Sequence, residues 1–592
     1  MSEQGGSGMK PGNGGKGKAQ PVQKAAAAQP SEVEDVAGEP TGRLGGEAQA
    51  LGYEQRRGVR AGWGRFLVAP RPLALLPGGV PQIEASALFA LLEEDPDVEP
   101  VAQVRPSRSR GLGAIAEPHP ACPPVAVVAM PQERAHALAA NPQVVVEIDQ
   151  PLSYTPTPSV GVCPVPVIDP MLAVTFEEPE QLTLRVVGSD GEAVAAAHVW
   201  AIGTGGPVHG TTGPDGRVTV TLAADTPETL QALYVRPVAD YWPARTAALR
   251  LHSGQEAVVE VQALAETFEG FPGAALTGWG AQAMRLNQVP PTYRGHGIKI
   301  ALMDSGVNTG HPDLKPTVRH GHDFTGTGNG TWGLDSTGHG TWCAGIIAAA
   351  DNNAGITGIA AEAELHALKL FPGGHLSDLI EAVDYCITHD IDIAQLSLAY
   401  PVPSQLIAWK LADAHAAGIT IIAPAGDTAG PLTHPASLPS VLSVGALAHT
   451  GTYPAHSPLA AMQPPWPGPY PAPFTPTGPG VDVVAPGAAV ITTAPGNGYT
   501  VADGTSIAAA HVTGLAALLL AHHDHLRTQV MPRMAARADR LYALLRTACR
   551  PLPGADSRLG AGIADAPTAL GIPTSWQQDY REQAYAAAYP RV

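Results

Sequence analysis

Between residues 279 and 572, short apolar segments alternate along the chain with segments of helical length. The apolar segments are rich in β-branched residues and predict strands at 298–303, 365–370, 393–398, 419–423 and 441–444. The longer segments predict helices at 377–389, 405–417 and 505–521. This alternation is typical of an α/β domain in which a parallel sheet carries helices on both faces. Active sites of such domains form at the carboxyl ends of the strands.

A different order of elements precedes this domain, between residues 63 and 154. The pattern predicts strands at 65–69, 101–104, 125–129 and 144–148 and helices at 83–92 and 131–141. The resulting β-α-β-β-α-β order indicates a small ferredoxin-like α+β domain. That fold alone indicates no function.

Residues 181–264 consist of short stretches in which apolar and polar residues alternate, separated by turn sequences. Strands expected at 182–187, 218–222 and 257–261 indicate a small antiparallel β-sandwich, an all-β domain. The hairpin sequence TGPDGRVTVTL resembles one that recurs in carboxypeptidase regulatory-like and transthyretin-like domains. Because no catalytic residues converge here, we expect a role in spacing or binding.

The remaining segments have compositions that favour loops or disorder. Residues 1–62 are rich in Gly, Ala, Pro and Lys and carry few large apolar side chains, so we expect them to be disordered. Residues 155–180 and 265–278 are expected to be linkers. Residues 573–592 form a polar-aromatic tail that we expect to be loosely attached.

Composition and charge narrow the classes of function. The chain has 592 residues, enough for several domains, and its apolar content of 44% is that of a globular protein. A formal charge of −18 without a long basic cluster argues against a nucleic-acid or membrane partner. The five cysteines are scattered and odd in number, which favours reduced thiols. Because residues 1–30 lack the apolar core of a secretory signal, we expect a cytoplasmic location, with export by another route left open.

One serine lies where an almost uncharged helical segment begins. In the sequence GTSIAAAHVTG, Ser506 would stand at the positive end of that helix, which stabilises negative charge forming nearby. By itself the pattern favours a serine that caps the helix. Two residues elsewhere change the picture, because Asp304 ends an expected strand and His339 lies in a GHGT sequence that opens another helix.

Acyl transfer needs a nucleophile, a base that takes its proton and a carboxylate that orients the base. The order Asp304, His339, Ser506 is the order found in subtilisin. The segments IALMDSGVNTGHPDL, STGHGTWCAGIIAA, LPSVLSVGAL, VDVVAPG and DGTSIAAAHVTGLAALLLA resemble the subtilisin-like (subtilase) family in order and spacing, over about half of the chain. The resemblance implies a serine endopeptidase in which Ser506 is the nucleophile, His339 the general base and then acid, and Asp304 the orienting carboxylate. It implies no cofactor for the chemistry.

The resemblance also implies where a polypeptide substrate binds. The substrate would join as an added strand between two segments of the protein. These segments are Ser397, Leu398 and Ala399 on one side and Ala423, Pro424 and Ala425 on the other. Thr433 falls where the floor of the specificity pocket is usually glycine, so we expect a shallow pocket that favours small side chains.

Asp313, in HPDL, and Asn352, in DNNAGITG, match residues of a calcium site in the family. Carboxylate and amide oxygens suit calcium. Asn and Asp are also common in loops for their local hydrogen bonds, so the plain loop-forming interpretation stays open. The resemblance therefore implies a structural calcium ion at these residues.

The main departure from the family is Asp427, in PAGDTAG, which falls on the asparagine of the oxyanion hole. An ionised carboxylate would repel the developing oxyanion, and losing the amide donor lowers kcat about 100- to 1,000-fold, a magnitude measured in subtilisin itself. A protonated Asp427 would instead donate a hydrogen bond; otherwise the Ser506 N–H and the helix end would support slow turnover. We expect a competent endopeptidase with an acid-shifted pH optimum. The alternative is a catalytically impaired pseudoprotease that acts as a binding or scaffold protein.

Two further differences from the family are milder. Ala510 replaces the usual proline after the nucleophile, which should alter the rigidity of the helix entry more than the chemistry. Residues 459–479 carry a proline-rich insertion. We interpret it as a rigid surface loop, with a rim for a substrate or partner as the sharper alternative.

Residues 65–154 also resemble the subtilisin propeptide, most clearly in ERAHALAANPQVVVEID. In that family the propeptide assists folding, inhibits the enzyme and is then cut. Its last residues correspond here to Leu152, Ser153 and Tyr154. The resemblance implies a self-inhibited precursor whose own propeptide-like domain is a partner of the catalytic domain. The β-sandwich between the two leaves open whether the parts separate after cutting, or whether cutting occurs.

Overall fold

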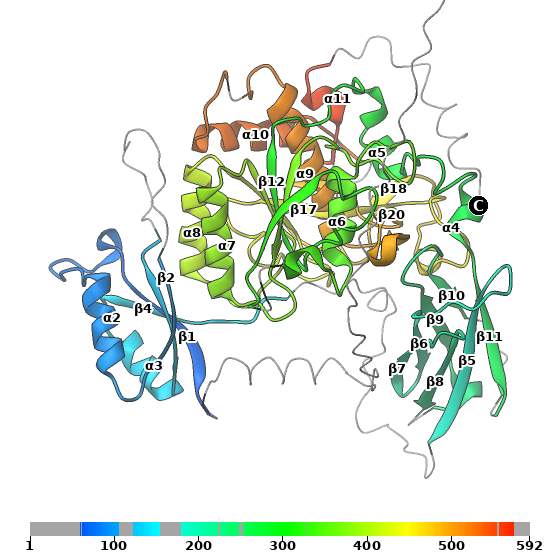
Figure 1. The fold of residues 1–592 in the computed structure, drawn as a ribbon, viewed down its shortest axis with the longest axis horizontal. Coiled ribbons are helices and arrows are strands. Elements are labelled where there is room, and N and C mark those ends of the chain that lie inside the picture. Colours follow the sequence, from blue (N-terminus) through cyan, green and yellow to red (C-terminus); the bar gives the residue numbers. More distant parts are fainter. Residues whose placement is uncertain are drawn as a thin grey trace, which may run out of the picture. The chain divides into compact units, whose positions relative to one another are not determined.

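The computed structural model describes residues 60–572 except 61, 106–121, 154–178, 223–224, 248–250, 253, 327, 329, 528 and 553–555. The predictions for Tyr154, for nearly all of residues 1–62 and 155–180, and for 573–592 therefore lie outside the described residues. We distinguish a ferredoxin-like domain (62–153), a β-sandwich domain (179–263) and an α/β domain (279–572), whose elements are labelled in Figure 1.

The α/β domain is built on a sheet with the strand order β13-β14-β12-β15-β16-β17-β19-β23-β22. Its strands are β12 (Lys299–Asp304), β13 (Val318–Asp323), β14 (Glu364–Lys369), β15 (Ile393–Leu396), β16 (Thr420–Pro424), β17 (Leu442–His449), β18 (Pro469–Pro471), β19 (Val483–Pro486), β22 (Cys549–Arg550) and β23 (Ile563–Ala564). Neighbouring strands from β13 to β23 are parallel, whereas β22 pairs antiparallel with β23 and β18 with β17. The central parallel sheet predicted from the sequence is confirmed.

Strand β12 shows how the sheet separates two apolar layers. Ile300 and Leu302 pack in one cluster with α6 (His339–Ala348) and α9 (Thr505–His522). Ala301 and Met303 pack in a second cluster with α7 (Leu376–Thr388) and α8 (Gln405–Ala416). Successive side chains of a strand point to opposite faces, so helices cover both faces of the sheet (Figure 1).

Helix α9 is the core helix of the α/β domain. By length and composition it could cross a membrane, but 89% of it is buried inside the protein. All but its last two residues are buried. A helix that is apolar on every side is the expected sequence for such a position.

The ferredoxin-like domain contains the six predicted elements in the predicted order. They are β1 (Gly64–Pro70), α2 (Ala85–Glu94), β2 (Glu99–Val104), β3 (Val125–Met130), α3 (Gln132–Ala139) and β4 (Val144–Ile148). The strands form an antiparallel sheet in the order β2-β3-β1-β4. Phe66 and Val68 face the side of α2 and α3, whereas Leu67 and Ala69 join the cluster of α7 and α8. The open face of this sheet is therefore buried against the α/β domain.

The β-sandwich domain has two sheets, in the orders β10-β9-β6-β7 and β11-β5-β8. Its strands are β5 (Glu180–Gly188), β6 (His198–Gly203), β7 (Gly206–Thr211), β8 (Arg217–Leu222), β9 (Ala232–Arg236), β10 (Ala244–Thr246) and β11 (Glu256–Val261). The expectation of an entirely antiparallel sandwich is wrong, because β11 pairs with β5 in parallel. These two strands lie far apart in the chain, so no hairpin forces them to be antiparallel.

The segment expected to be a linker over 265–278 packs against the α/β domain. It begins with α4 (Leu264–Thr267) and buries the side chains of Phe268 and Phe271. The remaining elements are helix α10 (Ala535–Thr547), the short helices α5 (Trp279–Ala283) and α11 (Ala566–Ala569), the strands β20 (Val490–Thr493) and β21 (Tyr499–Ala502), and 3-10 turns at Leu73–Leu75, Pro227–Thr229, Leu286–Gln288, Thr331–Gly333, Pro458–Ala461, Pro495–Asn497 and Ser557–Leu559.

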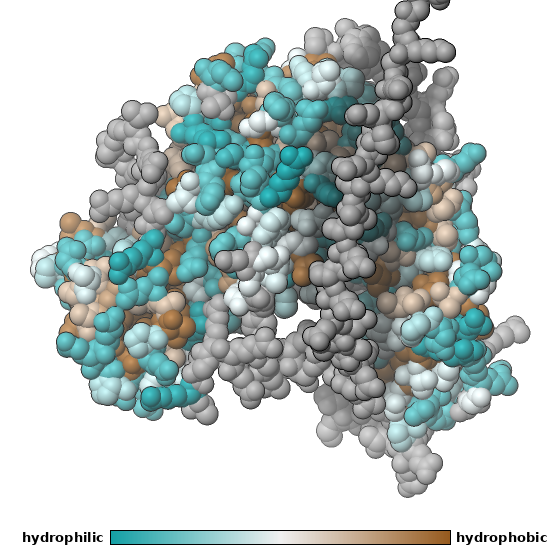
Figure 2. Space-filling view, in the orientation of Figure 1, coloured by the Kyte–Doolittle hydropathy of each residue, from teal (hydrophilic) through white to brown (hydrophobic). Residues whose placement is uncertain are grey.

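On the face shown in Figure 2, hydrophilic residues cover most of the α/β domain. The large apolar side chains exposed in this domain include Leu334, Val402 and Trp466. They are separated in the sequence, and single exposed apolar residues are usual on a protein surface. They indicate no docking site by themselves.

Candidate active site

Three elements of the α/β domain bring Asp304, His339 and Ser506 together. Asp304 is the last residue of β12, His339 the first of α6 and Ser506 the second of α9. A Cβ atom on Gly340 would lie 2.0 Å from the carbonyl oxygen of Gly306, so only glycine lets α6 start this close to the end of β12. This close approach places the histidine ring beside the carboxylate.

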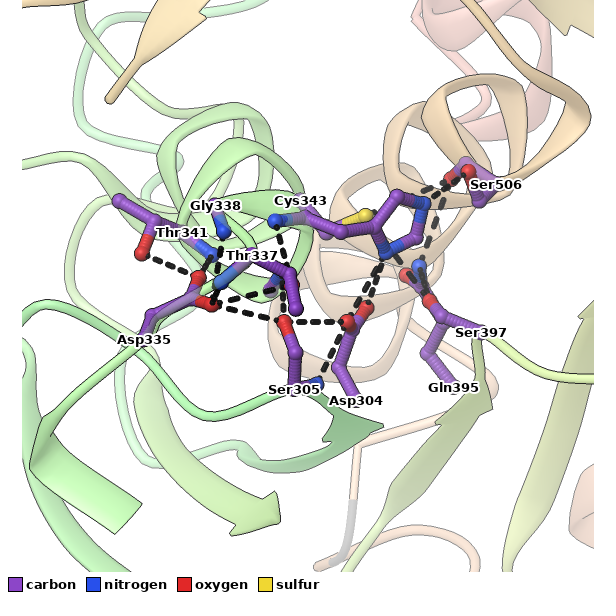
Figure 3. Close-up of polar contacts among 12 residues, drawn as sticks. Asp304, Ser305, Asp335, Thr337, Gly338, Thr341, Cys343, Gln395, Ser397 and Ser506 are labelled. Carbon is purple, nitrogen blue, oxygen red and sulfur yellow. Dashed lines mark hydrogen bonds and ion pairs between the residues drawn. The ribbon is translucent and has the colours of Figure 1, made fainter. Parts of the chain in front are cut away.

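The three side chains form one hydrogen-bonded chain (Figure 3). His339 Nδ1 lies 2.9 Å and 3.0 Å from the two carboxylate oxygens of Asp304, and His339 Nε2 lies 2.8 Å from Ser506 Oγ. All three are buried, with exposed fractions of 1% for Asp304, 3% for His339 and 5% for Ser506. With the ring proton on Nδ1, the serine hydroxyl donates to Nε2, and the imidazole can take the hydroxyl proton.

The charges around His339 set its pKa. Burial alone would lower the pKa, but the carboxylate of Asp304 outweighs it and the net shift is upward. Asp335 and Asp427 raise it further. The ring therefore becomes a neutral base only above the ordinary pKa of histidine.

Two polar residues that the sequence analysis did not single out fix the triad carboxylate. Ser305 donates to Asp304 Oδ1 from its N–H at 2.7 Å, and its hydroxyl donates to Asp335 Oδ1 at 2.9 Å. Asp335 in turn accepts from the N–H of Gly338 at 2.8 Å and of Thr341 at 2.9 Å (Figure 3). Asp335 therefore caps the helix that carries the histidine. Their positions beside Asp304 and just before His339 were the available signal.

Cys343 lies one turn beyond His339 and packs under the site. Its Sγ is 3.9 Å from the carbonyl oxygen of Ser506 and 3.8 Å from Ser397 Oγ. Burial raises the pKa of the thiol well above its ordinary value, so it stays neutral. The four cysteines in the described part of the chain are free thiols, as expected.

Asp427 follows β16 and lies beside the nucleophile. A Cβ atom built on Gly504 would be 3.5 Å from Asp427 Oδ2 and 3.1 Å from Ser506 Oγ, so both side chains flank the same glycine. The N–H of Thr505 donates to Asp427 Oδ1 at 2.7 Å. Burial raises the pKa of Asp427 to about 6, against the hydrogen bonds from Thr505 that lower it. The carboxyl group is therefore partly protonated in weak acid.

The chain itself supplies an added strand at one of the two expected substrate segments. Ser153 and Ala399 exchange backbone hydrogen bonds of 3.0 Å and 2.6 Å in an antiparallel bridge. Further along, Leu152 N–H donates to Gly374 O at 2.8 Å, and Leu376 N–H donates to Gln150 O at 3.0 Å. Residues 150–153 thus lie between Ala399 and residues 374–376, a segment that the sequence analysis missed.

The second expected segment, residues 423–425, does not flank this strand. Ala423 and Pro424 end β16 and pair with β17, and the carbonyl of Ala425 accepts from the Thr433 N–H at 3.1 Å. Thr433 also crowds Gly426, where an added Cβ would lie 3.0 Å from the threonine methyl group. Thr433 therefore lies beside the end of β16, and the shallow pocket stays a prediction. On the other segment, the hydroxyl of Ser397 accepts from Gln395 Nε2 at 2.9 Å, and Leu398 is buried.

The proline-rich insertion over 459–479 is anchored to the domain. Leu459, Tyr470 and Phe474 are buried, and the hydroxyl groups of Tyr453 and Tyr470 are 2.7 Å apart. This packing agrees with a rigid surface loop, and a rim for a substrate or partner stays open. Ala510 is fully buried inside α9.

The residues expected to bind calcium are surrounded by hydrogen-bond donors. Asp313 accepts from Asn352 Nδ2 at 2.9 Å, from the Tyr499 hydroxyl at 2.9 Å and from the Ile356 N–H at 3.2 Å. Calcium needs oxygen ligands around it, whereas both carboxylate oxygens are already used here. This arrangement does not fit a calcium ion, and we assign the pair a structural hydrogen-bonding role instead.

Comparisons with known proteins point to one family. The model of the subtilase family (Peptidase_S8) matches residues 295–562. Subtilisin E of Bacillus subtilis (strain 168) is 32% identical over 258 residues, which span 42% of this chain and 62% of subtilisin E. Subtilisin of Bacillus pumilus is 32% identical over 258 residues, 42% of this chain and 86% of that protein. Subtilisin Savinase of Lederbergia lenta is 34% identical over 249 residues, 41% of this chain and 83% of that protein.

Proposed function

The chain belongs to the subtilase family, and from this premise we propose that it is a serine endopeptidase made as a self-inhibited precursor. The observation that carries the proposal is the buried hydrogen-bonded chain from Ser506 through His339 to Asp304. A serine that merely capped its helix would need neither the imidazole at 2.8 Å nor the carboxylate behind it.

The proposed reaction follows from this geometry. As Ser506 Oγ bonds to the substrate carbonyl carbon, its proton passes to His339 Nε2, and Asp304 stabilises the imidazolium. The proton then passes to the leaving amine as the carbon–nitrogen bond breaks and the acyl-enzyme remains. Water, activated by the same imidazole, hydrolyses the ester and frees Ser506. The N–H of Ser506 belongs to the first turn of α9 and would stabilise the oxyanion together with the positive end of that helix.

An active-site-directed fluorophosphonate tests the nucleophile. We expect the probe to label the purified protein with a rate that rises with pH as His339 loses its proton. The Ser506→Ala variant should not be labelled. Ser443→Ala is the matched control: that serine is also buried, but its hydroxyl donates to the carbonyl of Gly480 at 2.7 Å, away from the triad, and the variant should keep the label. Absence of labelling over roughly pH 4–9, the range in which the base should titrate, would favour the pseudoprotease alternative.

Self-inhibition rests on the strand formed by residues 150–153. A polypeptide substrate would bind by adding a strand at the same backbone groups of Ala399 and residues 374–376. Leu152 is buried in the apolar cluster that also contains Leu376. The two occupants therefore exclude each other.

Two carboxylates hold this strand in position at the N-termini of helices. Asp149 accepts from the N–H and the hydroxyl of Ser377 in the first turn of α7, both at 2.9 Å, and pairs with Arg65. Glu147 accepts from the N–H of Gln405 at 2.8 Å, at the start of α8, and from the Ser404 hydroxyl. A helix N-terminus attracts negative charge, so both contacts attach the ferredoxin-like domain to the α/β domain.

Removing one of these carboxylates should weaken the inhibition. We expect Asp149→Ala to raise the initial rate of peptide hydrolysis by the uncut precursor at least about tenfold, because a buried charge partner lost from an interface costs about 2–5 kcal/mol. Asp97→Ala is the control, since Asp97 is exposed in the same domain. Equal rates for the two variants would mean that the Asp149 contact does not hold the inhibitory strand.

A further inference from the structure

We propose that the β-sandwich domain is a permanent part of the catalytic unit and that its Arg236 is a positioning residue for His339. The inference rests on the proposed endopeptidase function. It applies to residues that lie outside the segment matched by the subtilase family model, which begins at residue 295.

Arg236, at the end of β9, reaches the helix that carries the histidine. Its guanidinium carbon lies 4.8 Å from the ring centroid of Trp342, and that ring is 5.7 Å from the imidazole of His339 at 58°. The Trp342 Nε1 atom is buried and has no hydrogen-bond partner in the described part of the chain. The position of the indole is therefore set by packing and by the cation above it.

The charge of Arg236 also reaches the segment before the nucleophile. Burial raises the pKa of Asp503, and Arg236 opposes that rise. Asp503 accepts from the N–H of Ala489 at 2.7 Å and precedes Ser506 by three residues. One side chain of the sandwich thus acts on both catalytic elements.

Asp240 of the sandwich is hydrogen-bonded to the strand that leads to Ser506. Its N–H donates to the carbonyl of Tyr499 at 2.5 Å, and its Oδ1 accepts from the N–H of Tyr499 at 3.0 Å. Tyr499 begins β21, whose last residue precedes Ser506 by four positions. Both backbone groups of this residue are therefore held by the sandwich.

The partner strand of β21 completes the connection to α6. Thr492 and Thr493 of β20 donate their hydroxyls to the carbonyls of Trp342 at 2.6 Å and Thr341 at 2.7 Å. The β20–β21 hairpin thus joins the helix of His339 to the segment leading to Ser506. The sandwich contacts this unit at both ends, through Arg236 and through Asp240.

Aromatic packing explains why the sandwich should stay attached after the precursor is cut. Trp242 is 1% exposed, and its ring is followed by those of Phe268, Phe271 and Tyr499 at centroid distances of 6.4, 6.4 and 4.8 Å. These rings belong to the main apolar cluster of the α/β domain. Separation would expose them to water, and each buried aromatic side chain removes roughly 150–250 Å² of surface from water.

Kinetics of Arg236 variants test the positioning role. We expect Arg236→Ala to lower kcat about 5- to 20-fold, with KM changed by less than about twofold, because the interaction orients the base without touching the substrate. Arg236→Lys, which keeps a cation, should recover part of the loss. Arg217→Ala is the control, since Arg217 is exposed on β8 and pairs with Glu256 inside the sandwich. An Arg236→Ala variant with the kcat of Arg217→Ala would overturn the proposal.

A second measurement does not depend on activity. In a Ser506→Ala background, Arg236→Ala should speed amide hydrogen exchange in residues 339–348 and 490–502, whereas Arg217→Ala should not. If the wild-type protein neither hydrolyses peptides nor takes the fluorophosphonate, the proposed function fails and hydrogen exchange alone decides the positioning role. Unchanged hydrogen exchange in Arg236→Ala would refute the positioning role. A cut and active protein that lacks residues 180–261 by mass spectrometry would refute the permanent place of the sandwich in the catalytic unit.

Discussion

The Asp304→Asn variant is expected to hydrolyse peptides about 10,000-fold more slowly than the wild type at pH 8, with its fold intact. Asp304 accepts the Nδ1 proton of His339 at 2.9 Å, which leaves Nε2 free to accept the proton of Ser506. An asparagine can present its NH₂ group to the ring instead. The imidazole would then carry its proton on Nε2, where it cannot act as the base.

The fold should survive because the hydrogen bonds from Ser305 can still reach the amide oxygen. Circular dichroism and the melting temperature check this, and kcat is measured by release of a chromogenic peptide product. Asp482→Asn is the matched control: that carboxylate accepts from the N–H of Ser443 at 2.9 Å and pairs with Arg546, away from the triad. Its kcat should change by less than about threefold. A tenfold or smaller loss for Asp304→Asn would contradict the assigned role.

Much of the fold was predictable because it follows from local patterns. The strand ending at Asp304 and the helix beginning after Gly504 are marked by apolar runs bounded by small residues. The order of Asp304, His339 and Ser506 along the chain then identified the candidate triad. Parallel strands end at one edge of the sheet, and this brings residues that are distant in sequence to one place.

What the sequence did not predict depends on contacts between distant segments. The parallel pairing of β11 with β5 and the burial of Phe268 arise from docking, which leaves no periodic signal. Of the backbone partners of the strand over 150–153, Ala399 was predicted and residues 374–376 were not. Residues 374–376 carry no side chain that would mark them for that role. For calcium, the residue types were suggestive, but the Asn352 amide nitrogen that points at Asp313 is visible only in the structure.

The burial of Asp427 close to His339 could not be predicted from the sequence either. Because of this burial, the protonation states of the two residues depend on each other. Each interacts with the other: the charge of Asp427 raises the pKa of His339, and His339 lowers that of Asp427. We propose that Asp427, when protonated, donates to the oxyanion, so that full catalysis needs a neutral imidazole together with a protonated Asp427. The ring of His339 becomes neutral as pH rises through its raised pKa. The carboxyl group of Asp427 loses its proton as pH rises through about 6.

The active combination is therefore a minority state at every pH, and kcat/KM should follow a bell-shaped curve. Its maximum should lie between about pH 6, where Asp427 titrates, and the raised pKa of His339. The acid-shifted optimum expected from the sequence stays a prediction, for which the structure gives a sharper reason. Below this range the base is protonated, and above it an anion faces the developing oxyanion.

Asp427→Asn should remove the alkaline limb of that curve and raise kcat at pH 8 by about 10- to 100-fold. An amide donates a hydrogen bond at any pH, and one such donor in an oxyanion hole contributes about 100- to 1,000-fold to kcat. The single limb that remains should report the pKa of His339, which the charge of Asp427 no longer raises. Full pH profiles of kcat/KM for the two proteins measure both changes.

Asp427→Ala separates the two effects of the substitution. It removes the negative charge without supplying a donor, so it should show the same single limb but leave kcat at pH 8 well below that of Asp427→Asn. The hydrogen bond from Thr505 N–H to Asp427 Oδ1, 2.7 Å long, can be kept by the asparagine and not by the alanine. If Asp427→Asn is no faster than the wild type at neutral pH, the carboxyl group does not limit turnover. The oxyanion would then depend on the Ser506 N–H and the N-terminus of α9 alone.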